Sequence, residues 1–208
     1  MNLKNKKGTI FVVSGPSGTG KGTIMAKYLE QYPQDNSFLS ISATTRAPRV
    51  IDVEGVTYYF KTREEFEDLI ANDGLLEWAE FCGNYYGTPK GPIMNMIEEG
   101  KNVILEIEVQ GGMQVMEKIE DAVGIFVLPP SFKELKNRLV NRNTETMETI
   151  EKRLNRAKEE VDVIDKYDYI LINDDLDEAV ETFRSIIIGE TQKVNRNKNI
   201  IKEVCETC

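Results

Sequence analysis

Residues 9–23 read TIFVVSGPSGTGKGT, and this stretch decides the fold. The first six residues are rich in β-branched side chains and predict a buried strand, which breaks into a glycine-rich loop. A helical pattern follows, with one apolar face formed by Ile24, Met25, Tyr28 and Leu29. A strand that enters a helix through such a loop directs backbone N–H groups and the positive helix end at one point. The stretch therefore predicts a polyphosphate site in which Lys21 reaches the outer phosphates.

The loop matches the pattern G-x-x-x-x-G-K, but Gly22 follows the lysine where the full motif has Ser or Thr. In the full motif that hydroxyl binds Mg²⁺. The metal is therefore expected to be bound by water, phosphate or another side chain. The alternative interpretation is an ordinary turn between a strand and a helix, which the lysine and the flanking periodicity disfavour.

The composition indicates an ordinary soluble protein whose 208 residues can form one sizeable core. Its 26 basic and 35 acidic residues give a net charge of −9, which argues against general nucleic-acid binding. No apolar run approaches the roughly 20 residues needed to cross a bilayer. We expect a cytoplasmic protein with neither a nucleic-acid nor a membrane partner, and the sequence leaves monomer and homo-oligomer open.

The cysteines do not indicate a disulfide framework, because there are only three: Cys82, Cys205 and Cys208. The last two form a C-x-x-C pattern at the end of the sequence. A metal site would need more ligands, and the chain has no histidine. We expect a frayed tail with two reduced thiols.

Alternating strand and helix patterns predict an α/β protein with a mostly parallel central sheet. Short β-branched runs, typical of buried parallel strands, occur at 10–13, 103–107, 125–128 and 169–172. Capping boxes at 62–65 and 131–134 each open a helical pattern. A final helix is expected from about 176 to 193.

Two segments depart from this alternation. Residues from about 40 to 98 contain short alternating stretches, at 56–60 and 75–81, and predict a small α+β insertion. Residues from about 130 to 163 are helical and charge-dense, with a break near 141–144. Without a linker or internal repeat, the chain reads as one domain, whose core comprises about 1–39, 99–129 and 164–208.

Arginines and tyrosines in the insertion are candidate ligands for a phosphate. Arg46 and Arg49 are three residues apart and can both face one anion as bidentate donors. The segment 83–88 holds a glycine-flanked tyrosine pair, which could offer an aromatic face and hydroxyl donors. The alternatives are surface arginines in a polar loop and tyrosines that pack the core of the insertion.

Charged residues also gather where strands end and in the charge-dense segment. Glu106 and Glu108 are expected on one side of the strand 103–107, at the carboxyl end where α/β sheets bind ligands. There they can meet a metal–phosphate complex. Arg138 and Arg142 share a helical face, and Arg153 follows the break. Such arginines can close over a transferred phosphoryl group, although in such segments they are more often solvated.

Taken together, these motifs resemble the guanylate kinase family over nearly the whole chain. The resemblance rests on their order and spacing at 15–23, 42–49, 83–88, 106–111, 128–130 and 173–174. It implies a P-loop NTPase-type parallel sheet flanked by helices, with an inserted NMP-binding subdomain at about 40–98 and a helical lid at about 130–163. It also implies transfer of the ATP γ-phosphate to GMP, and dGMP, with ATP bound as its Mg²⁺ complex.

The resemblance assigns roles residue by residue. The ATP site comprises Gly15, Pro16, Ser17, Gly18, Thr19, Gly20, Lys21, Gly22, Thr23 and, near the adenine, Asn173. The GMP phosphate is assigned to Arg46, Arg49, Tyr58 and Tyr86. The guanine is assigned to Ser42, Glu77, Thr88 and Glu108. The implied catalytic residues are Lys21, Arg46, Arg138, Arg142 and Arg153.

Glu77 makes chemical sense in this role, because a carboxylate can accept from both N1–H and the exocyclic amine of guanine. No direct metal ligand is assigned. Mg²⁺ is expected on the nucleotide phosphates, with Glu106 and Glu108 as candidate protein ligands. Glu108 stands where an aspartate is commoner in the family. The rival interpretations are a non-catalytic guanylate-kinase-like module that binds proteins, and a kinase of the same fold for another nucleotide or a sugar phosphate.

Overall fold

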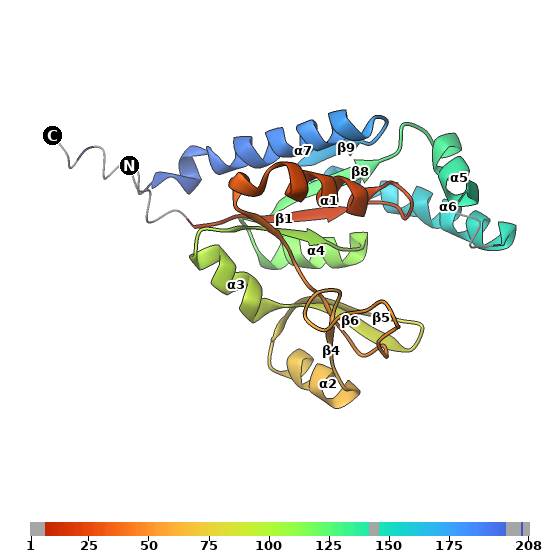
Figure 1. The fold of residues 1–208 in the computed structure, drawn as a ribbon, viewed down its shortest axis with the longest axis horizontal. Helices are drawn as coiled ribbons and strands as arrows, with labels where there is room; N and C mark the ends of the chain where they lie inside the picture. Colours follow the sequence, from red (N-terminus) through yellow and green to blue (C-terminus); the bar gives the residue numbers. More distant parts are fainter. Residues whose placement is uncertain (1–6, 142–145, 199–204, 206–208) are drawn as a thin grey trace.

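A five-stranded sheet forms the centre of the fold in the computed structural model, which describes residues 7–141, 146–198 and 205 (Figure 1). All neighbouring strands pair in parallel. In spatial order they are β2 (Ser37–Leu39), β7 (Asn102–Glu106), β1 (Ile10–Ser14), β8 (Val123–Leu128) and β9 (Tyr169–Ile172). Four of the five match predicted strands, and the edge strand β2 was not predicted.

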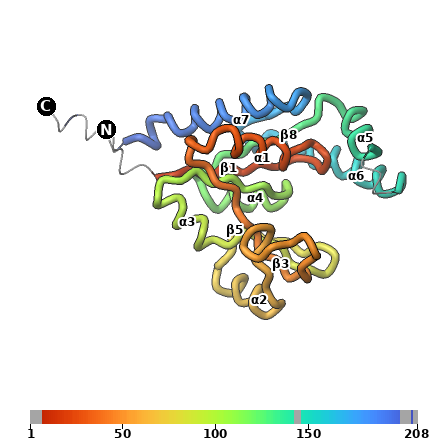
Figure 2. Tube along the Cα trace, in the orientation of Figure 1, coloured from red at the N-terminus to blue at the C-terminus, as the bar shows by residue number. Residues whose placement is uncertain are grey.

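Helices cover both faces of this sheet (Figures 1 and 2). Phe11 and Val13 of β1 pack on one face with α1 (Lys21–Gln31) and α7 (Leu176–Thr191). Ile10 and Val12 pack on the other face with α3 (Lys90–Glu98) and α4 (Val109–Lys118). The alternation of side chains along a strand explains this division, and it leaves β1 buried throughout.

A second sheet, in the order β4-β3-β6-β5, forms most of the insertion. Its strands are β3 (Ala43–Thr44), β4 (Tyr59–Phe60), β5 (Leu75–Phe81) and β6 (Asn84–Pro89). The helix α2 (Arg63–Ala71) begins with the predicted capping box and buries Phe66 against Ala43 and Leu75. The strand expected at 56–60 is shorter, because Gly55 donates to the carbonyl of Tyr58 in a turn. The helix α3 lies in the same sequence range but packs on the central sheet.

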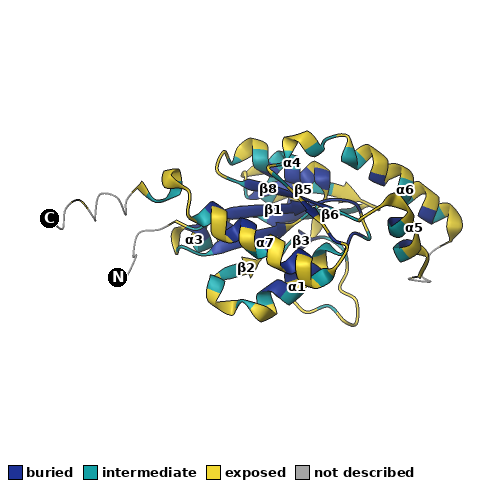
Figure 3. Cartoon of the chain, turned by 90° about the horizontal axis from the view of Figure 1, so that it is seen from above, coloured by how far each residue is buried: buried dark blue, intermediate teal, exposed yellow. Residues whose placement is uncertain are grey.

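A helical hairpin extends beyond the carboxyl end of β1 (Figures 1 and 3). Its helices are α5 (Phe132–Asn141) and α6 (Met147–Val161). They share a small core of Leu135, Leu139, Ile150 and Ala157. Ser131 caps α5 by accepting from the backbone N–H of Glu134 at 3.1 Å. The predicted break largely falls on residues 142–145, which lie outside the described residues.

Short 3₁₀ turns complete the chain at Pro33–Asp35, Ile164–Lys166 and Val194–Arg196. The expected end of the last helix was near residue 193, and α7 ends at Thr191. Among the residues that the structure describes, no helix combines the length and the apolar character needed to cross a bilayer. Cys205 is exposed, and Cys208 lies outside the described residues, so the reduced tail stays a prediction.

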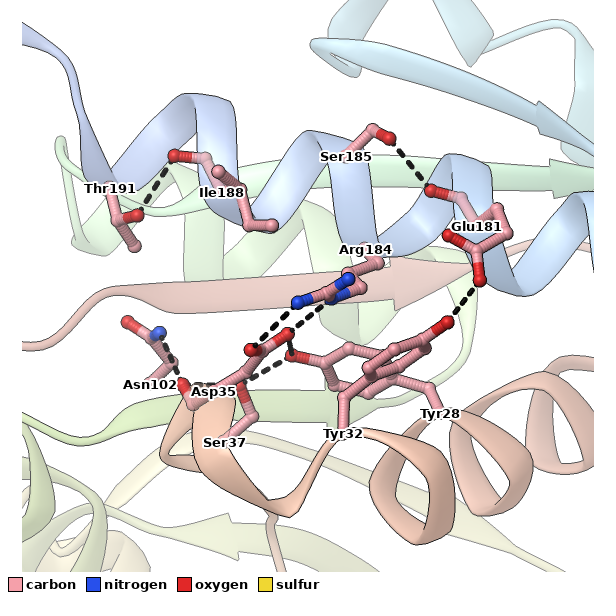
Figure 4. A network of polar contacts seen from close by, with 10 residues as sticks. All are labelled: Tyr28, Tyr32, Asp35, Ser37, Asn102, Glu181, Arg184, Ser185, Ile188 and Thr191. Atoms are coloured by element: carbon pink, nitrogen blue, oxygen red, sulfur yellow. Dashed lines mark hydrogen bonds and ion pairs between the residues drawn. The ribbon is translucent and has the colours of Figure 1, made fainter.

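A polar network fastens α7 to the connection between α1 and β2 (Figure 4). Arg184 donates to Asp35 at 2.9 Å and lies 4.0 Å from the centre of the Tyr32 ring. The hydroxyl of Tyr28 lies 2.9 Å from the Ser37 hydroxyl and donates to Asp35 at 3.4 Å. Burial raises the pKa of Tyr28 to about 12, because the ionised phenol would lose its hydration.

This shift makes the stability of the fold sensitive to high pH. Above about pH 10 the unfolded chain gains free energy by ionising Tyr28, whereas the folded chain keeps the proton until about pH 12. The contribution is complete below pH 10 and is lost as the pH rises. We expect its loss to lower the free energy of unfolding by about 2 kcal/mol at about pH 12. Over this pH range the free energy of unfolding, measured in urea, should fall less in Tyr28→Phe than in Tyr59→Phe. Equal falls would contradict the prediction.

Candidate functional site

The loop between β1 and α1 is held by its own lysine. Lys21 is the first residue of α1, and its ammonium donates to the carbonyls of Gly15 at 2.6 Å and Pro16 at 3.1 Å. Gly15 and Gly20 adopt positive φ angles of 138° and 89°, which other residues rarely adopt. The loop therefore curls around the start of α1, where the helix dipole favours an anion.

Asn173, directly after β9, stabilises this loop with a hydrogen bond. Its side-chain amide donates to the carbonyl of Thr19 at 2.7 Å, and the residue is buried. A Cβ atom at Gly20 would lie only 2.4 Å from the Asn173 nitrogen. The glycine and the asparagine thus depend on each other, and together they set the position of the loop.

A cleft of about 470 Å³ opens beside the loop. It is lined by Gly18, Gly20, Thr23, Arg138, Asn141, Asn173, Asp174 and Leu176. The guanidinium of Arg138 donates to Glu134 at 3.0 Å and to the backbone carbonyl of Asn173 at 3.0 Å. The structure thus brings Arg138 and Asn173 together next to the loop.

Glu106 ends β7 against the lysine-bearing turn. A Cβ atom at Gly22 would lie 3.3 Å from Oε2 of Glu106, so the carboxylate occupies the space beside that glycine. Desolvation raises the pKa of Glu106, while the charge of Lys21 and a hydrogen bond from the Gly22 N–H lower it. Within the described part of the chain no three His, Cys, Asp or Glu side chains form a metal-binding group.

The prediction that Glu106 and Glu108 lie on one strand is wrong. The strand β7 ends at Glu106, and Glu108 is the residue that precedes the first turn of α4. Glu106 therefore faces the loop at Gly22, and Glu108 contacts the hairpin instead. The chain turns here because Glu108 has extended backbone angles while Val109 begins the helix.

Two arginines of α6 contact residues outside the hairpin. Arg153 donates to the Ser17 hydroxyl of the loop at 2.8 Å. Arg156 donates to Glu108 at 2.7 Å and to Glu160 at 3.0 Å. Arg156 was not predicted as a site residue, because nothing in the sequence of a charge-dense helix distinguishes it from its solvated neighbours. Arg142, predicted beside Arg138, lies outside the described residues.

A buried carboxylate marks the other half of the site, between β5 and β6. Glu77 is 6% exposed, and its Oε1 accepts from the Thr88 hydroxyl at 2.7 Å. Burial raises the pKa of Glu77, and the nearby charge of Glu108 adds to this rise. The hydroxyl of Thr88 acts against it. A Cβ atom at Gly111 would lie 2.8 Å from Oε2, so this glycine makes room for the carboxylate.

The cationic end of this half is built around Arg46. Its guanidinium pairs with Asp52 at 2.9 Å and lies 5.3 Å from the centre of the Tyr58 ring. The ring of Tyr86 contacts that of Tyr58 edge-on, with 6.2 Å between the ring centres. The structure therefore brings Arg46, Tyr58 and Tyr86 together as predicted. The alternative, in which the tyrosines pack the core of the insertion, describes Tyr85, whose ring stacks on Phe66.

Asp52 is a second residue that sequence reasoning missed. Its carboxylate accepts from the backbone N–H of Arg49 at 2.7 Å as well as from Arg46. These contacts, led by the Arg49 N–H, lower the pKa of Asp52. Asp52 thus organises the loop that presents both arginines. Ser42 precedes β3, and its carbonyl accepts from the N–H of Tyr59.

Known proteins resemble this chain in sequence and in fold. A family model described as guanylate kinase matches residues 7–190. A guanylate kinase of Clostridium perfringens strain SM101 is 49% identical over 200 residues, which cover 96% of this chain and 92% of the relative. A guanylate kinase of Bacillus cereus strain ZK is 49% identical and is covered to 99%. The crystal structure of guanylate kinase from Anaplasma phagocytophilum superimposes with a TM-score of 0.73 at 35% identity, over 92% of this chain and 90% of that one.

The close approach of Gly111 to Glu77 predicts a measurable cost. In Gly111→Ala the added methyl group displaces the buried carboxylate, so we expect the free energy of unfolding to fall by about 1–2 kcal/mol. Gly91→Ala is the matched control, because Gly91 also lies in a helix and a Cβ there meets open space. It should gain up to about 1 kcal/mol from helix propensity. Equal stabilities in urea unfolding would refute the steric argument.

Proposed function

The chain belongs to the guanylate kinase family of ATP:GMP phosphotransferases, and we propose that its two half-sites hold the two nucleotides of this reaction. The single observation that carries this assignment is the buried Glu77–Thr88 pair, in which a carboxylate with 6% exposure accepts from a buried hydroxyl. Such a group is costly to bury unless a ligand or a partner uses it. The two halves meet at the carboxyl edge of the central sheet.

The donor half binds ATP through the loop. Residues 15–23 would hold its phosphates with backbone N–H groups, and Lys21 would exchange its contacts with the loop carbonyls for phosphate oxygens. The cleft between Arg138 and Asn173 has the size of a nucleoside site and would receive the adenosine. In this assignment Asn173 acts chiefly by positioning the loop, since its amide is already bonded to Thr19.

The acceptor half binds GMP. Glu77 would accept from N1–H and the exocyclic amine of guanine, while Ser42, Thr88 and Glu108 complete the contacts to the base. Adenine lacks that pair of donors, so the carboxylate would be left without its hydrogen bonds to the base. The phosphate would be held by Arg46, Arg49, Tyr58 and Tyr86. Because dGMP carries the same base and phosphate, we expect it to be a substrate as well.

The residues present fit a Mg²⁺ ion that arrives with ATP. Mg²⁺ commonly binds one or two carboxylates together with substrate phosphates and water. Glu106 would supply that carboxylate, since it occupies the space beside Gly22 where a Ser or Thr hydroxyl is missing. When bound, the ion would neutralise charge on the phosphates. Glu108, paired with Arg156, is the weaker candidate.

The protein would contribute position and charge, with no covalent intermediate. Lys21, Arg138, Arg142 and Arg153 would stabilise the transferred group from the donor side. Arg46 would align the acceptor phosphate. Arg153 already contacts the loop at Ser17, so α6 lies close enough to help exclude water from the transfer.

Removing the loop lysine should abolish the activity. We expect Lys21→Ala to lower kcat for ADP formation from ATP and GMP by at least about a hundredfold, because a positioned cation is lost next to the transferred group. Lys7→Ala is the control, since Lys7 pairs with Glu98 on the surface before β1. Both variants should keep the circular dichroism of the wild type. Retention of most activity in Lys21→Ala would refute the donor assignment.

The same coupled assay separates the proposed function from its rivals. The wild type should turn over GMP and dGMP, and turn over AMP, UMP and CMP far more slowly. No turnover of any nucleotide would favour the non-catalytic protein-binding module. Preference for AMP or UMP would overturn the role given to Glu77.

Replacing the buried carboxylate should affect the acceptor selectively. In Glu77→Gln one acceptor becomes a donor, so we expect KM for GMP to rise about tenfold to a hundredfold while KM for ATP stays within about twofold. The pKa of Glu77 is raised. As the pH falls, Glu77 therefore takes up a proton at a higher pH than an ordinary glutamate does.

The pH profile of kcat/KM for GMP checks this directly. The wild type should lose kcat/KM at low pH through Glu77 as well as through the GMP phosphate, whose second pKa is near 6. Glu77→Gln keeps only the phosphate contribution. Identical profiles for the two proteins would show that Glu77 does not bind the base in its ionised form.

A further inference from the structure

One face of α6 carries three polar side chains that make contacts with the loop, with Glu108 or with one another. Arg153, Arg156 and Glu160 follow at spacings of three and four residues, which place them on the same side of a helix. Arg153 contacts the donor loop at Ser17, whereas Arg156 contacts Glu108 in the acceptor half. The same helix thus touches both halves of the site, within one turn.

We propose that Arg156 is a positioning residue for the acceptor base, because its guanidinium holds the carboxylate of Glu108 in place from the lid helix. The inference rests on the proposed contact between Glu108 and guanine. It goes beyond that contact, since it assigns the orientation of Glu108 to a residue that touches neither nucleotide.

The geometry of the guanidinium supports this role. One terminal nitrogen of Arg156 donates to Oε2 of Glu108 at 2.7 Å, and Nε donates to Oε1 of Glu160 at 3.0 Å. The Glu160 side chain is only 16% exposed, so it fixes the arginine from its buried side. The planar fork of arginine suits such a bridge, because its donors point in set directions.

Glu108 needs such a partner. Its side chain is 63% exposed and lies in the turn before α4, where several rotamers are open to it. It also lies near the buried carboxylate of Glu77, whose charge repels it. Arg156 offsets this repulsion and selects one orientation. A carboxylate can accept from more donors than one, so the bond at Oε2 leaves capacity for the base.

A residue that fixes Glu108 in advance should lower the entropy cost of binding GMP and leave ATP binding alone. We expect Arg156→Gln to raise KM for GMP about threefold to fivefold, the upper range for a partly exposed ion pair. The values of kcat and KM for ATP should stay within about twofold. Arg156→Lys should recover part of the loss, because it keeps the charge without the fork.

Lys152→Gln is the matched control on the same helix. Like Arg156→Gln, it removes one positive charge and one ion pair with a glutamate four residues away, here Glu148. The Lys152 side chain is 75% exposed. We expect its kinetic constants to equal those of the wild type. An equal rise of KM for GMP in this control would overturn the proposal, because net charge alone would then explain the effect.

A double-mutant cycle with Glu108→Gln decides whether Arg156 acts through Glu108. We expect Arg156→Gln to raise KM for GMP in the wild type and to have no further effect once Glu108 is replaced. Fully additive effects would overturn the proposal, as would an unchanged KM in Arg156→Gln alone. An unchanged KM in Glu108→Gln would refute both this proposal and the Glu108 contact, whereas turnover of GMP by the wild type tests the proposed function separately.

Discussion

The parallel pairing of β1 with β7 on one side and β8 on the other is the constraint on which the site depends. In this register Val13 lies opposite Glu106, and Ser14 lies opposite Phe126. The three strands therefore end in one row, and whatever follows each strand is delivered to the same edge. The loop, Glu106 and the start of the hairpin are all placed by backbone hydrogen bonds between these strands.

Individual arginines of the candidate site are paired with nearby carboxylates in a protein that is acidic overall. The net charge of −9 repels nucleotides at a distance, so binding must depend on focused cations. The structure holds these cations with carboxylates: Arg46 with Asp52, Arg138 with Glu134, and Arg156 with Glu108. Partly exposed ion pairs add little to folding stability. In this structure each carboxylate fixes the direction in which its guanidinium points.

The sequence predicted most of the central sheet because its strands are encoded locally. Four strands are continuous apolar runs, which have few alternatives to burial. The strand β2 (Ser37–Leu39) escaped prediction, since it has three residues, lies at the edge and is half exposed. The loop at 15–23 was also predicted from the sequence, because the spacing of its glycines and its lysine are typical of a phosphate-binding loop.

The charged residues of the site were harder to predict, because their partners are distant in sequence. Asp52 and Arg156 look like solvated residues until the fold brings them to Arg46 and Glu108. The separation of Glu106 from Glu108 depends on where β7 ends, and element ends are poorly encoded.

The packing of Gly22 against Glu106 links two positions that lie 84 residues apart. A side chain at position 22 and a glutamate at position 106 compete for the same volume. A hydroxyl residue can enter the loop once the carboxylate at the end of β7 shifts by a few tenths of an ångström. The two positions are therefore coupled, because a substitution at either one changes the room available to the side chain at the other.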